Sequence, residues 1–364
     1  MSDFQIEDGV LVKYTGTDAV VVIPEGVTSI GSSAFEGCES LVNINLPEGV
    51  TSIGSSAFDG CKSLVNINIP DGVTAIEEVA FWGCKSLVNI NLPEGVTSIG
   101  SSAFWGCESL VNINIPDGVT SIGDDAFRDC ESLVNINIPD GVTSIGSYVF
   151  IGCKSLVNIN IPEGVTSIGI YAFCDCESLV NINIPDGVTS IGRYAFSGCE
   201  SLVNINIPDG VTSIGDGAFY GCESLVNINI PEGVTSIGDG AFWGCDSLKK
   251  IFISINKISL FDKSDKEVIL AAIMGCLTNF AEGKIEKEYE PILTELIINN
   301  LEDLMGYFKD DLPSIVFITK RKIITVETAE ELLEQCTTAE CRAVLVNYIN
   351  ELSGGRIDLD KYKL

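Results

Sequence analysis

Hydrophobic and polar positions follow one pattern that recurs every 23 residues along most of the chain. The stretch 41–63, LVNINLPEGVTSIGSSAFDGCKS, is one complete copy. Ten phenylalanines mark the copies in strict phase: Phe35, Phe58, Phe81, Phe104, Phe127, Phe150, Phe173, Phe196, Phe219 and Phe242. A fixed period of this length predicts a solenoid, in which each repeat forms one coil and buries its apolar side chains against its neighbours.

Each copy predicts two buried walls. Leu41, Ile44 and Leu46 are expected to point inward from a short strand, and the Val-Asn-Asn set between them is expected to face out. Pro47 ends this strand because proline cannot donate to the ladder. A second apolar set begins at Val50 on the opposite wall, and the phased Ala-Phe pair fills the interior between the walls.

The pattern CxSLxxIxLPxGVxSIGxxAF covers residues 4 to 253 and resembles the BspA-like leucine-rich repeat family, also called the Treponema pallidum type. The resemblance implies a curved right-handed solenoid whose LxxIxL strands form a parallel β-sheet on the concave side. It also implies cell-surface or host-binding roles, which many secreted members have. The first residues, MSDFQIEDG, lack the apolar segment of a signal peptide. We therefore expect a cytoplasmic location, with the cell surface by a non-classical route as the alternative.

The two ends of the chain depart from the repeat. In residues 1–24, the apolar positions from Phe4 to Val12 predict a strand, and a turn at 14–18 leads into Ala19–Ile23, so a hairpin is expected to form an N-terminal β cap. Residues 25–260 form the solenoid, and residues 261–364 form a small all-α domain that caps its other end. The expected fold class is α+β.

About four helices are expected in this last domain. Ser264 with Glu267, Thr328 with Glu331, and Thr337 with Glu340 are typical of capping boxes at helix starts. Pro291 fits the first turn of another helix, and Gly283 ends the first one. The last fifty or so residues also resemble the helical hairpins that end many bacterial members of the family.

The net charge of −30 argues against binding to nucleic acid or anionic lipid, which requires clustered Lys and Arg. No run of about 18 apolar residues is present to insert into a membrane. Acidic residues follow the prolines as a ladder from Glu25 to Glu232. It could be a row of calcium sites or a solvated turn, and we favour the solvated turn because no GGxGxD loop is present.

Ten of the 14 cysteines hold one repeat position, from Cys38 to Cys245. Equivalent Cβ vectors on stacked coils run parallel, so we expect buried, reduced thiols rather than disulfides. Zinc would need convergent ligands, and the chain has no His and no CxxC. We therefore expect no metal and no cofactor. Cys174 occupies a variable position and is the one repeat cysteine that we expect to react early.

Variation between the copies is greatest at three positions, two after each SIG triplet and one after each Phe. All three tryptophans of the chain occupy the position after Phe. Exposed aromatic residues on consecutive coils are typical of binding hot spots, although these rings could instead pack on the next coil. The expected partner-binding residues are Trp82, Trp105, Tyr148, Tyr171, Tyr194, Tyr220, Trp243, Arg128 and Arg193.

The favoured function is a non-enzymatic interaction module for a protein partner, such as a host or cell-surface protein, or for a glycan, acting as a monomer. The alternative is a structural or adhesive array that uses the repeated Val-Asn-Asn face. For most of these Asn we favour a structural role, with stacked amides bonded along the solenoid. An enzyme in the helical domain ranks last, because the sequence offers no catalytic residues: no His, no phosphate-binding loop and no evident nucleophile–base pair.

Overall fold

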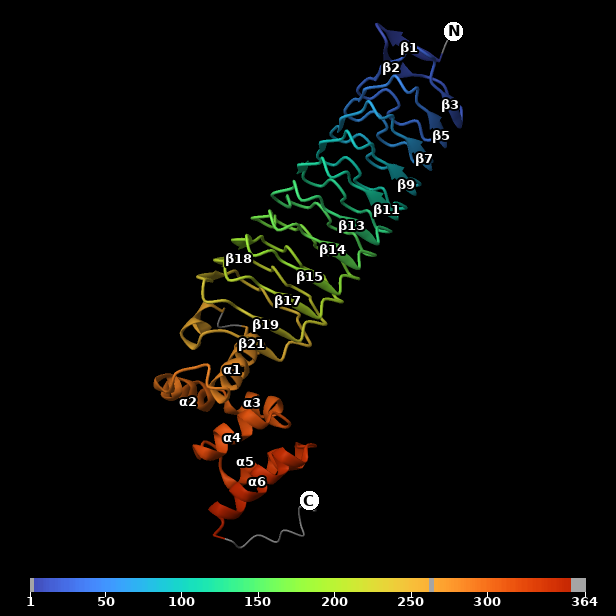
Figure 1. The fold of residues 1–364 in the computed structure, drawn as a ribbon. Helices are drawn as coiled ribbons and strands as arrows, with labels where there is room; N and C mark the ends of the chain where they lie inside the picture. Colours follow the sequence, from blue (N-terminus) through green and yellow to red (C-terminus); the bar gives the residue numbers. More distant parts are fainter. Residues whose placement is uncertain (1–2, 262–264, 355–364) are drawn as a thin grey trace. The chain divides into compact units, whose positions relative to one another are not determined.

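The computed structural model describes residues 3–261 and 265–354. The chain forms a parallel β-solenoid followed by a helical region, as expected (Figure 1). It divides into two compact units, residues 1–225 with 233–247 and residues 226–232 with 248–364. The last strand thus belongs to the unit that contains the helices. The expected boundaries at residues 24 and 260 stay predictions.

In the first unit, the Asn-Ile-Asn segments of successive coils pair in parallel and in register. The central Ile of each is buried and the flanking Asn are exposed, because side chains alternate across a strand. These strands are β5 (Asn43–Asn45), β7 (Asn66–Asn68), β9 (Asn89–Asn91), β11 (Asn112–Asn114), β13 (Asn135–Asn137), β14 (Asn158–Asn160), β15 (Asn181–Asn183) and β17 (Asn204–Asn206).

The second wall is built from two-residue strands whose Ile is mostly buried. At Ile145 and Ile168 only isolated bridges form. The strands are β4 (Ser29–Ile30), β6 (Ser52–Ile53), β8 (Ala75–Ile76), β10 (Ser98–Ile99), β12 (Ser121–Ile122), β16 (Ser190–Ile191), β18 (Ser213–Ile214) and β20 (Ser236–Ile237).

A column of phenylalanine rings fills the space between the walls. From Phe35 to Phe242, neighbouring ring centroids lie 5.2–5.6 Å apart with planes 2–12° from parallel. Nine of the ten rings are completely buried, and Phe242 is 2% exposed. Each coil therefore depends on its neighbours for most of its core contacts.

The N-terminal hairpin lies closer to the start of the sequence than predicted. Strand β1 (Phe4–Glu7) pairs antiparallel with β2 (Val10–Tyr14) around Asp8 and Gly9, both of which have positive φ. Strand β3 (Val20–Val22) instead pairs in parallel with β5. The prediction of a hairpin that uses Ala19–Ile23 is wrong, because the Asp-Gly pair sets a tight turn that lies before it.

In the second unit, strands β19 (Asn227–Asn229) and β21 (Lys250–Phe252) pair in parallel. The described residues then hold six α-helices, rather than the expected four or so, and two short 3₁₀ segments, η1 (Ile255–Leu260) and η2 (Lys287–Tyr289). The α-helices are α1 (Lys266–Ala281), α2 (Glu290–Asn299), α3 (Leu301–Phe308), α4 (Leu312–Lys320), α5 (Val326–Gln335) and α6 (Ala339–Leu352).

The helix starts differ from those predicted. Ser264 lies outside the described residues, and Asp265 caps α1 by accepting a hydrogen bond from the Val268 backbone. Helix α5 is capped by Thr325 rather than Thr328, and α6 begins after Thr338 rather than Thr337. Each segment holds adjacent or nearby threonines, so sequence spacing alone does not choose between them. Pro291 lies in the first turn of α2, and Gly283, with φ +73°, follows the end of α1, as predicted.

Helix α1 packs directly on strand β21. A Cβ atom at Gly275 would overlap the carbonyl oxygen of Ile251 and come within 2.5 Å of its carbonyl carbon. The thiol of Cys276 lies 3.3 Å from the Ile253 carbonyl oxygen, to which it donates. Gly275 thus allows a contact between the helix and the strand backbone that no larger residue would permit.

The phased cysteines are free, and nine of the ten are buried, as predicted. From Cys61 onward, each thiol donates to the carbonyl oxygen of the Phe in the preceding coil at 3.1–3.2 Å. Cys38, in the first coil, is half-buried. Cys174 is 6% exposed, and burial raises its pKa to about 12, so its place at a variable position does not make its thiol accessible.

We predict instead that Cys38 is the first repeat cysteine to be labelled in the native protein. The thiolate is the reactive species, and burial raises the pKa of Cys61 to about 12, which leaves almost no thiolate at about pH 8. Labelling with a maleimide and mapping by mass spectrometry checks the order. Full labelling is expected after unfolding in urea, whereas rapid native labelling of Cys107 or Cys174 would contradict the burial described here.

Candidate interaction surface

The variable residue two positions before each Phe has a left-handed backbone in all ten coils. Its φ lies between 53° and 61°, whether the residue is Ser, Val, Asp, Tyr or Gly. This backbone conformation is energetically costly for a bulky residue such as Val79 or Tyr148. Because it recurs in every coil whatever the residue type, the geometry of the turn imposes it. The turn therefore holds Tyr148, Tyr171 and Tyr194 in one repeated orientation.

Six variable side chains stack in order along the coils, and we name them the aromatic ladder: Trp82, Trp105, Arg128, Tyr148, Tyr171 and Tyr194. The Trp82 and Trp105 ring centroids are 5.6 Å apart, and the tyrosines stack at 5.2 and 4.9 Å. The Arg128 guanidinium lies 4.4 Å from the Trp105 centroid and 5.9 Å from that of Tyr148, so it joins the tryptophans to the tyrosines. Tyr220 and Trp243 form a separate edge-to-face pair at 5.4 Å.

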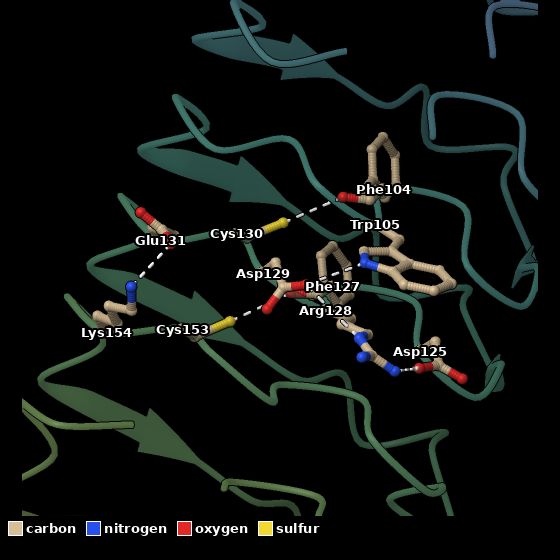
Figure 2. Close-up of polar contacts among 10 residues, drawn as sticks. All are labelled: Phe104, Trp105, Asp125, Phe127, Arg128, Asp129, Cys130, Glu131, Cys153 and Lys154. Atoms are coloured by element: carbon tan, nitrogen blue, oxygen red, sulfur yellow. Dashed lines mark hydrogen bonds and ion pairs between the residues drawn. The ribbon is translucent and has the colours of Figure 1, made fainter. Parts of the chain in front are cut away.

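Two carboxylates hold Arg128 in place, as Figure 2 shows. One terminal nitrogen of its guanidinium bonds Asp125 Oδ1 at 3.1 Å, and its Nε lies 3.5 Å from Asp129 Oδ2. The Trp105 indole Nε1 donates to the same Asp129 oxygen at 3.0 Å. A guanidinium, an indole and two carboxylates thus form one charge-paired cluster, in which the buried Arg128 Nε has an ion-pair contact but no hydrogen bond.

The second expected arginine is also paired within the chain. Arg193 Nε lies 3.1 Å from Asp216 Oδ2, and its side chain remains 60% exposed. Sequence reasoning missed Asp125, Asp129 and Asp216, the partners of the two arginines. Asp125 and Asp216 lie on the variable face, which is the surface formed by the three variable positions of each coil. Asp129 lies next to it, two positions after Phe, where most copies have Gly.

Exposure along the variable face is uneven. Trp82 is 41% exposed, Tyr220 40% and Trp243 64%, whereas the inner members of the ladder are half-buried. Ile170, which was not among the expected binding residues, is 40% exposed beside Tyr171. The rings therefore pack on neighbouring coils and still leave open aromatic surface at Trp82 and at the Tyr220–Trp243 pair.

The Asn face differs from its expected structural role. The strand Asn are exposed, and in the coils that the structure describes no hydrogen bond joins their amides, so the favoured ladder of bonded amides is not observed. Between β11 and β14 these side chains line a shallow hollow of about 500 Å³. Their amide groups remain open to solvent or to a ligand.

Over residues 3–261 and 265–354, no three His, Cys, Asp or Glu side chains gather as a metal site. No helix in those ranges is long and apolar enough to cross a membrane.

Comparison with known proteins supports the repeat assignment. A model of the BspA type leucine rich repeat region matches residues 15–133, 97–207 and 167–264. The crystal structure of a T. pallidum leucine-rich repeat protein is 38% identical over 49% of this chain and 88% of its own, with a TM-score of 0.46. A leucine-rich repeat protein from Bacteroides ovatus is 29% identical over 69% and 94%, with a TM-score of 0.39.

A leucine rich cell surface protein from Faecalibacterium prausnitzii is 28% identical over 72% of this chain and 93% of its own, with a TM-score of 0.41. No curated protein matches the chain. The family match spans more than half of the residues and coincides with the coils described above. The chain therefore belongs to the BspA-type leucine-rich repeat family.

Proposed function

We propose that this chain is a non-enzymatic interaction module that contacts a protein partner through its variable face. Leucine-rich repeat proteins generally serve as interaction or adhesion modules, and their stacked coils create extended binding surfaces. The observation that carries the proposal is the open aromatic surface at Trp82, Tyr220 and Trp243, in a chain whose copies otherwise hardly differ.

Stacking suits these residues for binding. The rings of the ladder are already held by neighbouring coils, so a partner would lose little side-chain freedom on contact. Large aromatic side chains also supply most of the binding energy in many interfaces. We place the protein in the cytoplasm, because its 14 cysteines are free thiols, with the cell surface by a non-classical route as the alternative.

The Asn face supports a second candidate function, an adhesive array. Its amides are exposed and unbonded in the described coils, and they line the hollow between β11 and β14. A glycan would suit such a row of amide donors and acceptors, whereas a protein hot spot requires the aromatic surface. The two candidates therefore predict opposite effects of substitution on the two faces.

An alanine scan of both faces tests the proposal against a partner captured from a lysate. We expect Trp82→Ala or Trp243→Ala to weaken binding by about 2–4 kcal/mol, as exposed aromatic hot-spot residues do. Asn89→Ala, in a strand adjoining the Trp82 turn, is the matched control and is expected to have almost no effect. Circular dichroism confirms folding of each variant. The proposal fails if folded Trp82 and Trp243 variants bind like the parent, and loss of binding in the Asn89 variant would favour the adhesive array.

A further inference from the structure

We infer that the partner presents an arginine side chain to the open side of Trp82, where Glu36 and Asp59 supply the opposite charge. This inference rests on the proposed function, because it names the chemistry that the variable face recognises. The residues that directly follow each Phe form a column of side chains along the coils. The inference follows from comparing two neighbouring parts of this column, one of which already contains a guanidinium.

The chain itself shows how this face binds arginine. The Arg128 guanidinium lies 4.4 Å from the Trp105 centroid and pairs with Asp125 and Asp129. The cluster therefore combines an aromatic face with two carboxylates, which is the environment that a planar cation prefers. Arg128 occupies the position after Phe, one coil beyond Trp105.

On the other side of the tryptophan pair, the same position holds acids. The order along the column is Glu36, Asp59, Trp82, Trp105 and Arg128. Backbone hydrogen bonds of 2.7 Å connect these coils in sequence, from Gly37 N to the Asp59 carbonyl and from Gly60 N to the Trp82 carbonyl. The two indoles therefore have a bound guanidinium on one side and two carboxylates on the other.

The acidic side has the charge for a cation but does not contain one. Among the described residues, neither Glu36 nor Asp59 forms an ion pair. Burial raises the pKa of Asp59, and the nearby charge of Glu36 raises it further. A cation placed here would relieve this repulsion and could lie against Trp82, which is 41% exposed.

Arginine fits this site better than lysine. Its guanidinium is planar, so it can stack on the indole and bond two carboxylates at once, whereas lysine offers a strongly hydrated point charge. The net charge of −30 would also attract a basic segment over a distance. The expected ligand is therefore an arginine-bearing, basic segment of a protein.

Intrinsic fluorescence provides a direct test, because all three tryptophans lie on the variable face. The full-length protein is titrated with a short oligoarginine peptide and with an oligolysine peptide of equal length, at about 0.15 M salt to screen non-specific attraction. We expect the arginine peptide to change tryptophan emission and to bind about tenfold more tightly than the lysine peptide.

Two charge variants locate the site. Glu36→Gln with Asp59→Asn is expected to weaken oligoarginine binding by about tenfold. Glu25→Gln with Glu48→Gln removes the same charge from the same two coils but from the ladder after the prolines, and is expected to change binding less than about twofold. Trp82→Leu keeps an apolar contact with Trp105 and is expected to lose the preference for arginine over lysine.

Equal binding of the two peptides, or equal effects of the two charge variants, would overturn this inference. Either result would leave the proposed function standing if the Trp82 and Trp243 alanine variants still lose the captured partner. Conversely, normal capture by those alanine variants would refute the proposed function, whatever the peptides do.

Discussion

Replacing Phe127 with alanine is expected to lower the free energy of unfolding by about 3–5 kcal/mol, the usual cost of removing a buried phenylalanine. The ring is fully buried and stacks at 5.5 Å on Phe104 and 5.6 Å on Phe150. Its removal leaves a cavity between two rings whose positions are fixed by their own coils. Because each coil is stabilised only by its immediate neighbours, loss of the Phe127 ring is expected to lower the stability of the central coils of the solenoid.

Urea denaturation followed by circular dichroism measures this change. Asn135→Ala, on the exposed side of strand β13 between the Phe127 and Phe150 turns, is the control and is expected to cost less than about 0.5 kcal/mol. A loss below about 1 kcal/mol for Phe127→Ala would mean that the ring column contributes little to stability.

Replacing Gly275 with valine is expected to destabilise the second unit by about 3 kcal/mol, the upper end of the usual cost of overpacking. The new side chain would meet the carbonyl group of Ile251 and, at 3.0 Å, the backbone nitrogen of Phe252. These are backbone atoms of strand β21, so they cannot move aside as a flexible side chain would. Helix α1 must therefore shift away from the strand.

Helix α3 provides a matched control within the same unit. A Cβ atom at Gly306 would meet nothing within 4 Å, so Gly306→Ala is expected to stabilise its helix by up to about 1 kcal/mol. Thermal unfolding of both variants and of the parent gives the comparison. If Gly275→Val unfolds at the parent's temperature, the close packing of α1 on β21 is wrong.

The core was predictable from sequence because the apolar pattern within each coil determines which of its side chains point inward and which point outward. Leu41, Ile44 and Phe58 are buried as the apolar pattern requires, and the same holds at equivalent positions along the solenoid. The repeat removes the usual ambiguity of short strands, since many copies agree on one phase. Helix starts were harder to predict, because neighbouring threonines such as Thr325 and Thr328 are equally suited to cap α5.

The backbone conformation and side-chain contacts of the variable face were harder to predict, because they depend on three-dimensional geometry that residue spacing does not encode. The left-handed backbone at Tyr148, Tyr171 and Tyr194 had a sequence signal in Gly217 and Gly240, which occupy the same repeat position. The placement of Arg128 between Trp105 and Tyr148 had no such signal, because it depends on how two variable positions meet across coils.

Acrylamide quenching of tryptophan fluorescence tests the central claim most directly, because every tryptophan lies on the variable face. Trp82 and Trp243 are 41% and 64% exposed, so quenching of the free protein is expected to be efficient. When a captured partner is bound, we predict that the quenching constant falls and that the emission shifts to shorter wavelength. A complex that co-elutes from size-exclusion chromatography yet shows the same quenching and emission as the free protein would contradict the assignment of this face as the binding surface.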